Sequence, residues 1–385
     1  MKKLNLDKKI LSILKKNKIK KSSVHEPFFS KLEINNIIKC IKNNDVASSG
    51  RETISFSNKI KTFTKSRYVV LVNSGTSAIH LALRSLNIKE NDEVLMPSLN
   101  YIAAANSTLY CNAVPHFIEI SERTLAIDPN KFENYLRRIS IFKKNKLFNK
   151  TTKREIKALI CLHTFGHPAE IDKIYKICKK FKLYLIEDAA ESLGSFYKKK
   201  HLGTFGDIGV LSFNANKIIT SVGGGAILTS SKIIANKIRK MSNIGKVSHK
   251  YKYMYDTLGY NYKLPNLNCA IGLAQLKKIN LFLTKKRKLT LKYKTMFSNL
   301  NNVTIFEEPL NSKSNYWLQT LILNKRNIKD RESILKTLNK NGYGARPVWQ
   351  LLHKVNYLKK FPKTNLKISE SLSKKIINLP SSSFL

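Results

Sequence analysis

The sequence predicts an α/β protein in which a large domain, built on a mostly parallel sheet, is followed by a smaller C-terminal α+β domain. The chain has 385 residues, which is enough for two domains. Apolar runs alternate with segments of helical periodicity over about the first 275 residues. Most of these runs are apolar throughout, as expected for strands that helices cover on both faces.

The elements of the large domain are predicted in chain order. A helix is expected after Ser30, which stands three residues before Glu33 in the spacing of a capping box. Strands are expected at 68–74, 92–98, 113–120, 156–165, 181–188 and 208–215. Helices are expected between them, the clearest at 76–86 and 171–182. The basic stretch 137–157 is expected to be an exposed helix or loop.

The sequence pattern changes after about residue 270. A single long amphipathic helix is predicted at 270–300, followed by a strand at 316–324 and a helix at 330–342. We therefore expect a basic N-terminal extension at 1–24, a large domain at 25–275 and a small domain at 276–385.

The composition and charge of the chain limit the kinds of partner and the compartment that we expect for it. The formal charge of +45 comes from lysines scattered through the whole chain, which is typical of a solvated surface. The five cysteines lie far apart without a CxxC pair, a pattern that suits the reducing cytoplasm. No run approaches the ~20 apolar residues of a membrane span. We expect a cytoplasmic protein without a membrane span that does not bind nucleic acid.

A phosphate-binding turn is predicted where the strand at 68–74 meets the helix at 76–86. Residues 73–77 read Asn-Ser-Gly-Thr-Ser, so backbone N–H groups around Gly75 and Thr76 are open to a ligand. The partial positive charge of a helix N-terminus favours an anion there. The alternative is an ordinary helix cap, for which Ser and Thr are equally suited.

Two charged residues, Asp188 and Lys217, stand at positions where a ligand could bind. Asp188 ends an apolar strand, where ligands of open α/β sheets bind, and a carboxylate there needs a cationic or hydrogen-bonding partner to remain charged. Lys217 stands in a polar turn before Gly223, Gly224 and Gly225, where an amine can act as a nucleophile toward an aldehyde. The alternatives are a helix N-cap for Asp188 and an exposed turn lysine for Lys217.

Taken together, the three features match pyridoxal phosphate, which presents a phosphate, a pyridine nitrogen and an aldehyde. The chain resembles the DegT/StrS family of sugar-nucleotide aminotransferases, which depend on this cofactor. The resemblance runs from His25 to Ser383 and is carried by "NSGTSAIHLAL", "MPSLNYIAAAN", "FGHPAEID", "IEDAAESLGS", "GDIGVLSFNANK" and "LGYNYKLPNLNCAIGLAQL". It implies the type I aminotransferase fold.

The resemblance also implies roles for single residues. Lys217 holds the cofactor aldehyde and is the catalytic residue, and Asp188 contacts the pyridine nitrogen. Tyr101 stacks on the ring and Glu191 approaches the cofactor. The phosphate is held by Gly75, Thr76 and Ser212. Asn261 matches a residue that reaches the neighbouring subunit's cofactor, which implies a homodimer with shared active sites.

Two departures from the family pattern stand out. Val222 occupies a position where many relatives have glycine, and the segment around Arg346, Trp349 and His353 lacks the prolines that relatives often carry. Arg346, Trp349 and His353 are therefore candidate substrate contacts only. His163 and His167 do not share a helical face and no third ligand follows them, so no metal site is predicted.

The predicted reaction moves an amino group from an amino acid, with glutamate the expected donor, to a 4-keto-6-deoxy nucleotide sugar. The product would serve surface polysaccharide or nonulosonic acid synthesis, with legionaminic acid and bacillosamine pathways as the models. Three alternatives remain open: a 3-keto nucleotide-sugar aminotransferase, a basic nucleic-acid-binding protein, and a non-catalytic paralogue.

Overall fold

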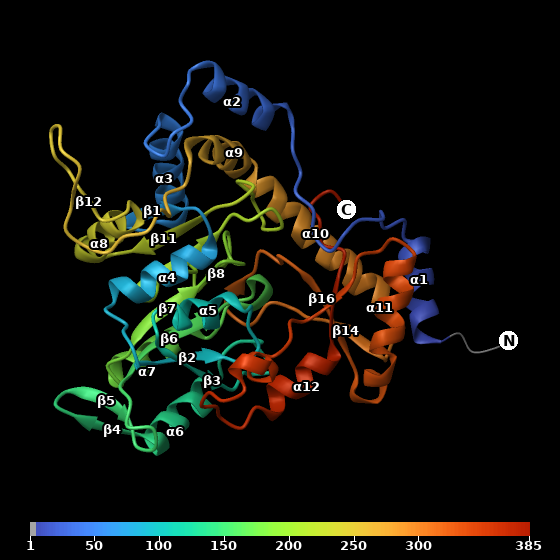
Figure 1. Ribbon diagram of the computed structural model, residues 1–385. Helices are drawn as coiled ribbons and strands as arrows, with labels where there is room; N and C mark the ends of the chain where they lie inside the picture. Colours follow the sequence, from blue (N-terminus) through green and yellow to red (C-terminus); the bar gives the residue numbers. More distant parts are fainter. Residues whose placement is uncertain (1–4) are drawn as a thin grey trace.

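The computed structural model describes residues 5–385, and its large domain is built on a seven-stranded sheet (Figure 1). Six strands run parallel to one another and β11 runs antiparallel between β1 and β10. In sheet order the strands are β1 (Tyr68–Val72), β11 (Gly225–Thr229), β10 (Ile208–Ser212), β7 (Tyr184–Asp188), β6 (Ile156–Leu162), β2 (Glu93–Pro97) and β3 (Val114–Ile118). The predicted α/β class is therefore confirmed.

Helices cover both faces of this sheet, which explains why the strands are apolar throughout. Every residue of β2, β3, β10 and β11 is buried. One face packs against α3 (Arg51–Thr64), α6 (Pro129–Ile139), α7 (Ile171–Lys180) and α9 (Asn266–Lys277). The other face packs against α4 (Gly75–Ser85), α5 (Ala103–Leu109) and α8 (Lys232–Ser242).

The small domain holds a four-stranded antiparallel sheet. Its strands, in sheet order, are β14 (Val303–Ile305), β16 (Gln319–Leu323), β18 (Ile376–Leu379) and β17 (Arg346–Pro347). The helices of this part of the chain are α10 (Ile279–Phe297), α11 (Arg331–Lys340) and α12 (Lys367–Lys375). Short 3₁₀ turns lie at 325–330, 352–354 and 356–358.

The predicted N-terminal extension contributes a packed helix. Helix α1 (Leu6–Lys16) lies beside α11 in Figure 1, and its Ile10 and Leu14 are fully buried in the core of the small domain. Residues 1–4 of the extension lie outside the described residues. Residues 6–16 thus cover the small domain although they are far from it in the sequence.

Helix α2 (Lys31–Lys42) begins at the predicted capping box. The Ser30 backbone N–H donates to the Glu33 carboxylate at 2.8 Å, and the Leu32 N–H donates to the Ser30 hydroxyl at 3.4 Å. No helix among residues 5–385 is both long enough and apolar enough to cross a membrane.

Two local expectations were wrong. The basic stretch 137–157 forms the end of α6 and a β-hairpin, β4 (Ser140–Lys143) and β5 (Lys146–Asn149). Lys144 and Asn145 both take positive φ, as the tight turn of a two-residue hairpin requires. The helix expected at 270–300 is broken at Lys278 into α9 and α10, where the backbone leaves helical geometry (φ −97°, ψ 1°).

Two small ribbons complete the fold. Strands β8 (Phe196–Tyr197), β9 (Lys200–His201) and β15 (Ser312–Lys313) form one of them, which links the two domains. Strands β12 (Lys246–Val247) and β13 (Met254–Tyr255) form a hairpin that extends away from the body of the molecule (Figure 1).

Candidate active site

A cavity of about 340 Å³ lies at the carboxyl ends of β7 and β10, beside the N-terminus of α4. The structure brings together there all the predicted cofactor-binding residues except Asn261. They are Gly75, Thr76, Tyr101, Asp188, Glu191, Ser212 and Lys217. Ligands of open α/β sheets bind at this edge, so the topology explains why segments so far apart meet.

The N-terminus of α4 forms an anion cradle. Ser74 caps the helix, since its hydroxyl accepts the N–H of Ser77 at 3.0 Å. The N–H groups of Gly75 and Thr76 precede the first possible intrahelical bond and stay open. A Cβ at Gly75 would stand 3.0 Å from the Cβ of Ser212, so a larger residue would have to push this turn and β10 slightly apart. Ser212 closes the opposite side of the cradle.

Asp188 ends β7 as a buried carboxylate with few partners. Its Oδ1 accepts the N–H of Ala190 at 3.2 Å. Burial raises the pKa of this carboxyl, and the charge of Lys217 only partly opposes the shift. The site therefore favours a cationic group beside Asp188, which is what a protonated pyridine nitrogen would supply.

Lys217 is directed into the cavity and is largely shielded from solvent. Its Nζ donates to Glu191 Oε1 at 3.4 Å and lies 3.9 Å from the centre of the Trp317 ring. The second oxygen of Glu191 accepts the N–H of Phe165 at 2.8 Å. Burial raises the pKa of Glu191 to about 7, against the opposing charge of Lys217. Lys217 is thus not the exposed turn lysine of the alternative interpretation.

Sequence reasoning missed Trp317, which comes from the small domain. Its ring is held by a hydrogen bond from Nε1 to the carbonyl of Asn216 at 2.6 Å. The one signal in the sequence was its rarity, because the chain has only two tryptophans. The other tryptophan, Trp349, also lines the cavity and lies edge-on to Tyr101, with ring centres 6.2 Å apart.

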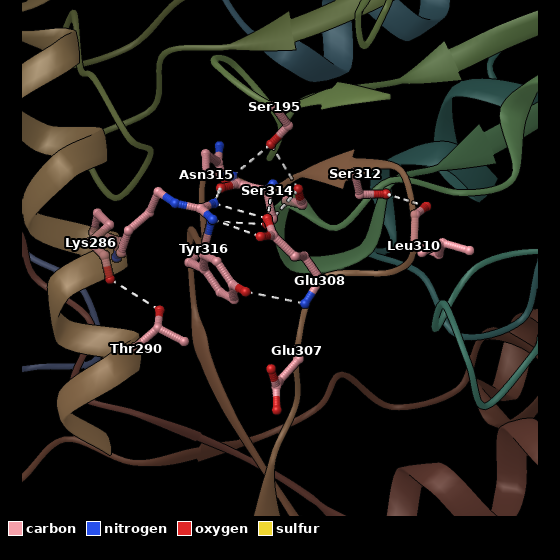
Figure 2. A network of polar contacts seen from close by, with 12 residues as sticks. Ser195, Lys286, Thr290, Glu307, Glu308, Leu310, Ser312, Ser314, Asn315 and Tyr316 are labelled. Carbon is pink, nitrogen blue, oxygen red and sulfur yellow. Dashed lines mark hydrogen bonds and ion pairs between the residues drawn. The ribbon is translucent and has the colours of Figure 1, made fainter. Parts of the chain in front are cut away.

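The loop before Trp317 fastens the small domain to the active site. Figure 2 shows Asn315 and Ser314 of this loop beside Ser195 of the large domain. The side-chain N–H₂ of Asn315 donates to the carbonyls of Glu191 (2.8 Å) and Leu193 (3.0 Å). Its Oδ1 accepts the N–H of Trp317 at 2.8 Å. One buried amide therefore connects the backbone of Glu191 to the tryptophan that covers Lys217.

A second cavity of about 770 Å³ adjoins the first and shares Asn216, Trp317 and Trp349 with it. Arg346, a candidate substrate contact, lies on its wall and is exposed. His353 is placed differently: both ring nitrogens are engaged, by Ser98 Oγ at 2.6 Å and Glu370 Oε1 at 3.0 Å. It lines neither of these two cavities.

Asn261 follows the β12–β13 hairpin and is not among the residues that line the cavity. It is exposed, and its carbonyl accepts a long hydrogen bond of 3.4 Å from Asn73, which does line the cavity. Val222 also lies outside the cavity wall, while Gly223 and Gly224 form part of it. The unusual valine therefore does not stand between Lys217 and a ligand.

His163 and His167 do not form a pair. His163 Nε2 contacts Glu187 Oε2 at 3.1 Å, and His167 packs edge-on against the rings of Phe306 and Tyr316. Among residues 5–385, no three His, Cys, Asp or Glu side chains are arranged to hold a metal.

The residues present fit pyridoxal phosphate. The cradle at Gly75 and Thr76 suits its phosphate, Asp188 suits its pyridine nitrogen, and Lys217, whose Nζ is held by Glu191 at 3.4 Å, lines the same cavity and suits its aldehyde.

Comparison with known proteins agrees with this geometry. The model of the DegT/DnrJ/EryC1/StrS aminotransferase family matches residues 28–385. A GDP-perosamine synthase from Escherichia coli O157:H7 is 34% identical over 359 residues, covering 93% of this chain and 92% of the relative.

A UDP-4-amino-4,6-dideoxy-N-acetyl-beta-L-altrosamine transaminase from Campylobacter jejuni is 30% identical over 332 residues, covering 85% and 83% of the two chains. In fold, the chain resembles the PLP form of the putative sugar aminotransferase Spr1654 from Streptococcus pneumoniae. The TM-score is 0.84 at 20% identity, over 95% of each chain.

Proposed function

The chain belongs to the DegT/DnrJ/EryC1/StrS aminotransferase family, and from that premise we propose that it transfers an amino group from glutamate to a 4-keto-6-deoxy nucleotide sugar. Membership confirms the resemblance seen in the sequence, and with it the pyridoxal-phosphate cofactor and the aminotransferase fold. What we propose beyond family membership is the amino donor, the acceptor sugar and the position of amination.

One observation carries it: the amine of Lys217, the buried carboxylate of Asp188 and the open N–H groups at Gly75 and Thr76 line one cavity. Each of these groups matches a different part of the cofactor. Any one of them alone has an ordinary structural explanation, but the three together do not.

The cofactor supplies an electron sink that weakens the bonds at the carbon bearing the amino group. Asp188 would keep a positive charge stable at its side of the site, because its buried carboxylate forms no ion pair with another residue of 5–385. Lys217 carries a proton to and from the substrate carbon through Nζ, as a general base and acid. Glu191 accepts a hydrogen bond from that same Nζ and so fixes where the amine rests. Trp317 excludes water from one side of it.

The substrate class is inferred from the relatives and from the second cavity. One relative is named for a 4-amino-4,6-dideoxy sugar linked to UDP, and another for GDP-perosamine. The cavity of about 770 Å³ that adjoins the lysine offers room for a nucleotide sugar. Arg346 on its wall would pair with the diphosphate. The product would be a 4-amino sugar for surface polysaccharide or nonulosonic acid synthesis.

We further propose a cytoplasmic homodimer in which Asn261 reaches the partner's active site. Asn261 and much of the hairpin next to it are exposed, and neither lines the protein's own cavity. Helix α2 also exposes apolar side chains, with Ile34 54% and Ile41 56% accessible. All five cysteines are unpaired and buried, which suits a reducing compartment.

The test is spectroscopic. Protein loaded with pyridoxal phosphate should show a visible absorbance band that is lost on adding glutamate. Borohydride reduction should fix the cofactor to the peptide containing Lys217, and Lys217→Ala should abolish both results. Product mass with GDP-, UDP- and dTDP-linked 4-keto and 3-keto sugars then identifies the acceptor. A band that glutamate leaves unchanged, or turnover of 3-keto sugars only, would contradict the proposal.

A further inference from the structure

His25 lies in the segment that joins α1 to α2, and this segment is fixed to the small domain. The carbonyl of Val24 accepts the N–H of Ser381 at 2.7 Å, and the Glu26 N–H donates to the Ser382 hydroxyl at 2.8 Å. These bonds stand on either side of His25. The main chain is therefore held in place on both sides of His25.

Both ring nitrogens of His25 are shielded from solvent and have no hydrogen-bond partner among the described residues. Buried polar atoms are ordinarily satisfied, because leaving them unpaired costs free energy. His167 also lacks partners, but two aromatic rings pack against it. His25 instead lines the cavity of about 770 Å³. The unpaired ring therefore belongs to the wall of a space that a ligand can fill, and a small turn of the ring would bring a nitrogen to that ligand.

That cavity leads to the reacting lysine, since it shares Asn216, Trp317 and Trp349 with the cavity around Lys217. Its other polar groups differ in kind. Arg346 carries a permanent positive charge, whereas Gln350 is neutral and exposed; the amide of Asn339 is already engaged by the backbone of Leu335 and Ala345. A ligand with an anionic part and a neutral hydroxylated part fits such a wall.

His25 belongs with the neutral groups. Burial lowers its pKa well below the usual range, and the charges of Lys286 and Lys217 act in the same direction. A neutral imidazole offers one hydrogen-bond donor and one acceptor. Either nitrogen can bond a hydroxyl group, which both donates and accepts, whereas a phosphate only accepts and is better served by the charge of Arg346.

We infer that His25 is a substrate-contacting residue that hydrogen-bonds a hydroxyl group of the sugar ring and helps select the sugar. The inference rests on the proposed function, because it assumes a nucleotide-sugar acceptor. It gives the N-terminal segment a role in substrate binding, although no predicted cofactor-binding residue lies in that segment.

Two variants test it. His25→Phe keeps a flat ring of similar size but removes both polar atoms, and His25→Asn keeps one donor and one acceptor. Three quantities are measured on cofactor-loaded protein: the rate of the absorbance change with glutamate, kcat/KM for the ketosugar that the wild type uses, and inhibition by the matching nucleoside diphosphate.

For His25→Phe we expect kcat/KM for the sugar to fall about tenfold or more, as for the loss of a buried hydrogen bond. The glutamate half-reaction and the inhibition constant of the nucleoside diphosphate should stay within about twofold. His25→Asn should recover part of the loss. As a comparison, Arg346→Gln should weaken nucleoside diphosphate inhibition.

Equal losses in both half-reactions would overturn the inference, because they would indicate a structural role. So would an unchanged kcat/KM for the sugar. A wild-type enzyme that reacts with glutamate but with no ketosugar of the panel would overturn the proposed function and this inference together. If the wild type converts a ketosugar but the His25 variants do not behave as expected, only this inference fails and the proposed function stands.

Discussion

Glu191 is a buried carboxyl group whose pKa lies near neutral pH. Its pKa is raised to about 7 from 4.5, first by burial and then by the nearby charge of Asp188, against the opposing charge of Lys217. An acid whose pKa is raised by folding binds its proton more tightly in the folded state. Stability therefore falls as pH rises from about 4.5 to about 7, and the full penalty is present above that window.

We expect Glu191→Gln to remove this penalty. The stability of the variant relative to wild type should increase by about 3 kcal/mol between pH 4.5 and pH 8, as follows from the size of the shift. Urea unfolding of cofactor-free protein across this range measures it. The exposed Glu122→Gln is the control and should follow the wild type. Profiles for Glu191→Gln and wild type that run parallel with pH would refute the assignment.

Val222 is a β-branched residue at φ +69°, a conformation that glycine adopts with less strain. Its side chain is 56% exposed, so little buried surface is lost on removing it. We expect Val222→Gly to raise the free energy of unfolding by about 1 kcal/mol, after allowing for the flexibility that glycine adds to the unfolded chain. Because Val222 is not part of the cavity wall, activity should change less than about threefold.

The denaturation midpoint of Val222→Gly should be compared with that of Val222→Ala. Alanine keeps a Cβ and should regain only part of the difference. A large rise in turnover on Val222→Gly would instead support the view that valine impairs this enzyme, as the non-catalytic alternative supposes. A loss of stability in Val222→Gly would show that the valine makes a contact worth more than its strain.

The loop between β14 and β16 connects domain packing to the active site. In Figure 2, Glu308 accepts hydrogen bonds from the backbone of Ser314 and from a guanidinium group that belongs to Arg287 of α10. A Cβ at Gly166 would meet Asn315 Oδ1 at 1.9 Å, and Gly166 has φ +90°, so glycine alone permits this approach. The loop is therefore held by hydrogen bonds and close packing up to Trp317.

We expect Asn315→Asp to break this connection. The carboxylate keeps the acceptor for the Trp317 N–H but replaces the two donors, so it faces two carbonyls. The free energy of unfolding should fall by about 2–4 kcal/mol, since buried acceptors lose their partners. Trp317 fluorescence should shift as its environment opens. Urea unfolding and emission spectra measure both effects.

Ser312→Ala is the matched control, because Ser312 lies on the same loop and its hydroxyl makes only one contact, at 3.5 Å. It should behave as the wild type. If Asn315→Asp were as stable as Ser312→Ala, the loop would not fasten the two domains as described.

Elements with local signals were predictable, and those set by distant partners were not. The buried strands, the capping box at Ser30 and the turn at Gly75 follow from composition and spacing. The β4–β5 hairpin was missed because its turn uses Lys144 and Asn145 and not glycine. Trp317 and His25 were missed as site residues because tertiary packing alone brings them to the cavities.

At the scale of the whole molecule, the active site draws on distant parts of one chain. The large domain supplies Asp188 and Lys217, and the small domain covers them with Trp317. The N-terminal segment adds His25 to the neighbouring cavity. Asn261 lines neither cavity and is exposed beside a hairpin that extends from the body. If Asn261 takes part in the reaction, we expect it to do so in the site of a second copy of the chain.

Subunit complementation tests this directly. Lys217→Ala and Asn261→Ala should each be poorly active, but refolding them together should restore activity. A mixed dimer with shared sites has one site that lacks both groups and one site that is intact. Random mixing in equal amounts makes half of the dimers mixed, so recovery should approach about a quarter of the wild-type rate.

Mixing Lys217→Ala with Lys217→Met is the control and should recover nothing, because every site then lacks the amine. Absence of recovery with Asn261→Ala, in protein that sedimentation shows to be dimeric, would place Asn261 outside the partner's site. Sedimentation of the wild type as a monomer would remove the dimer itself. Recovery near a quarter requires both groups to meet across the interface, since no single chain in the mixture holds both.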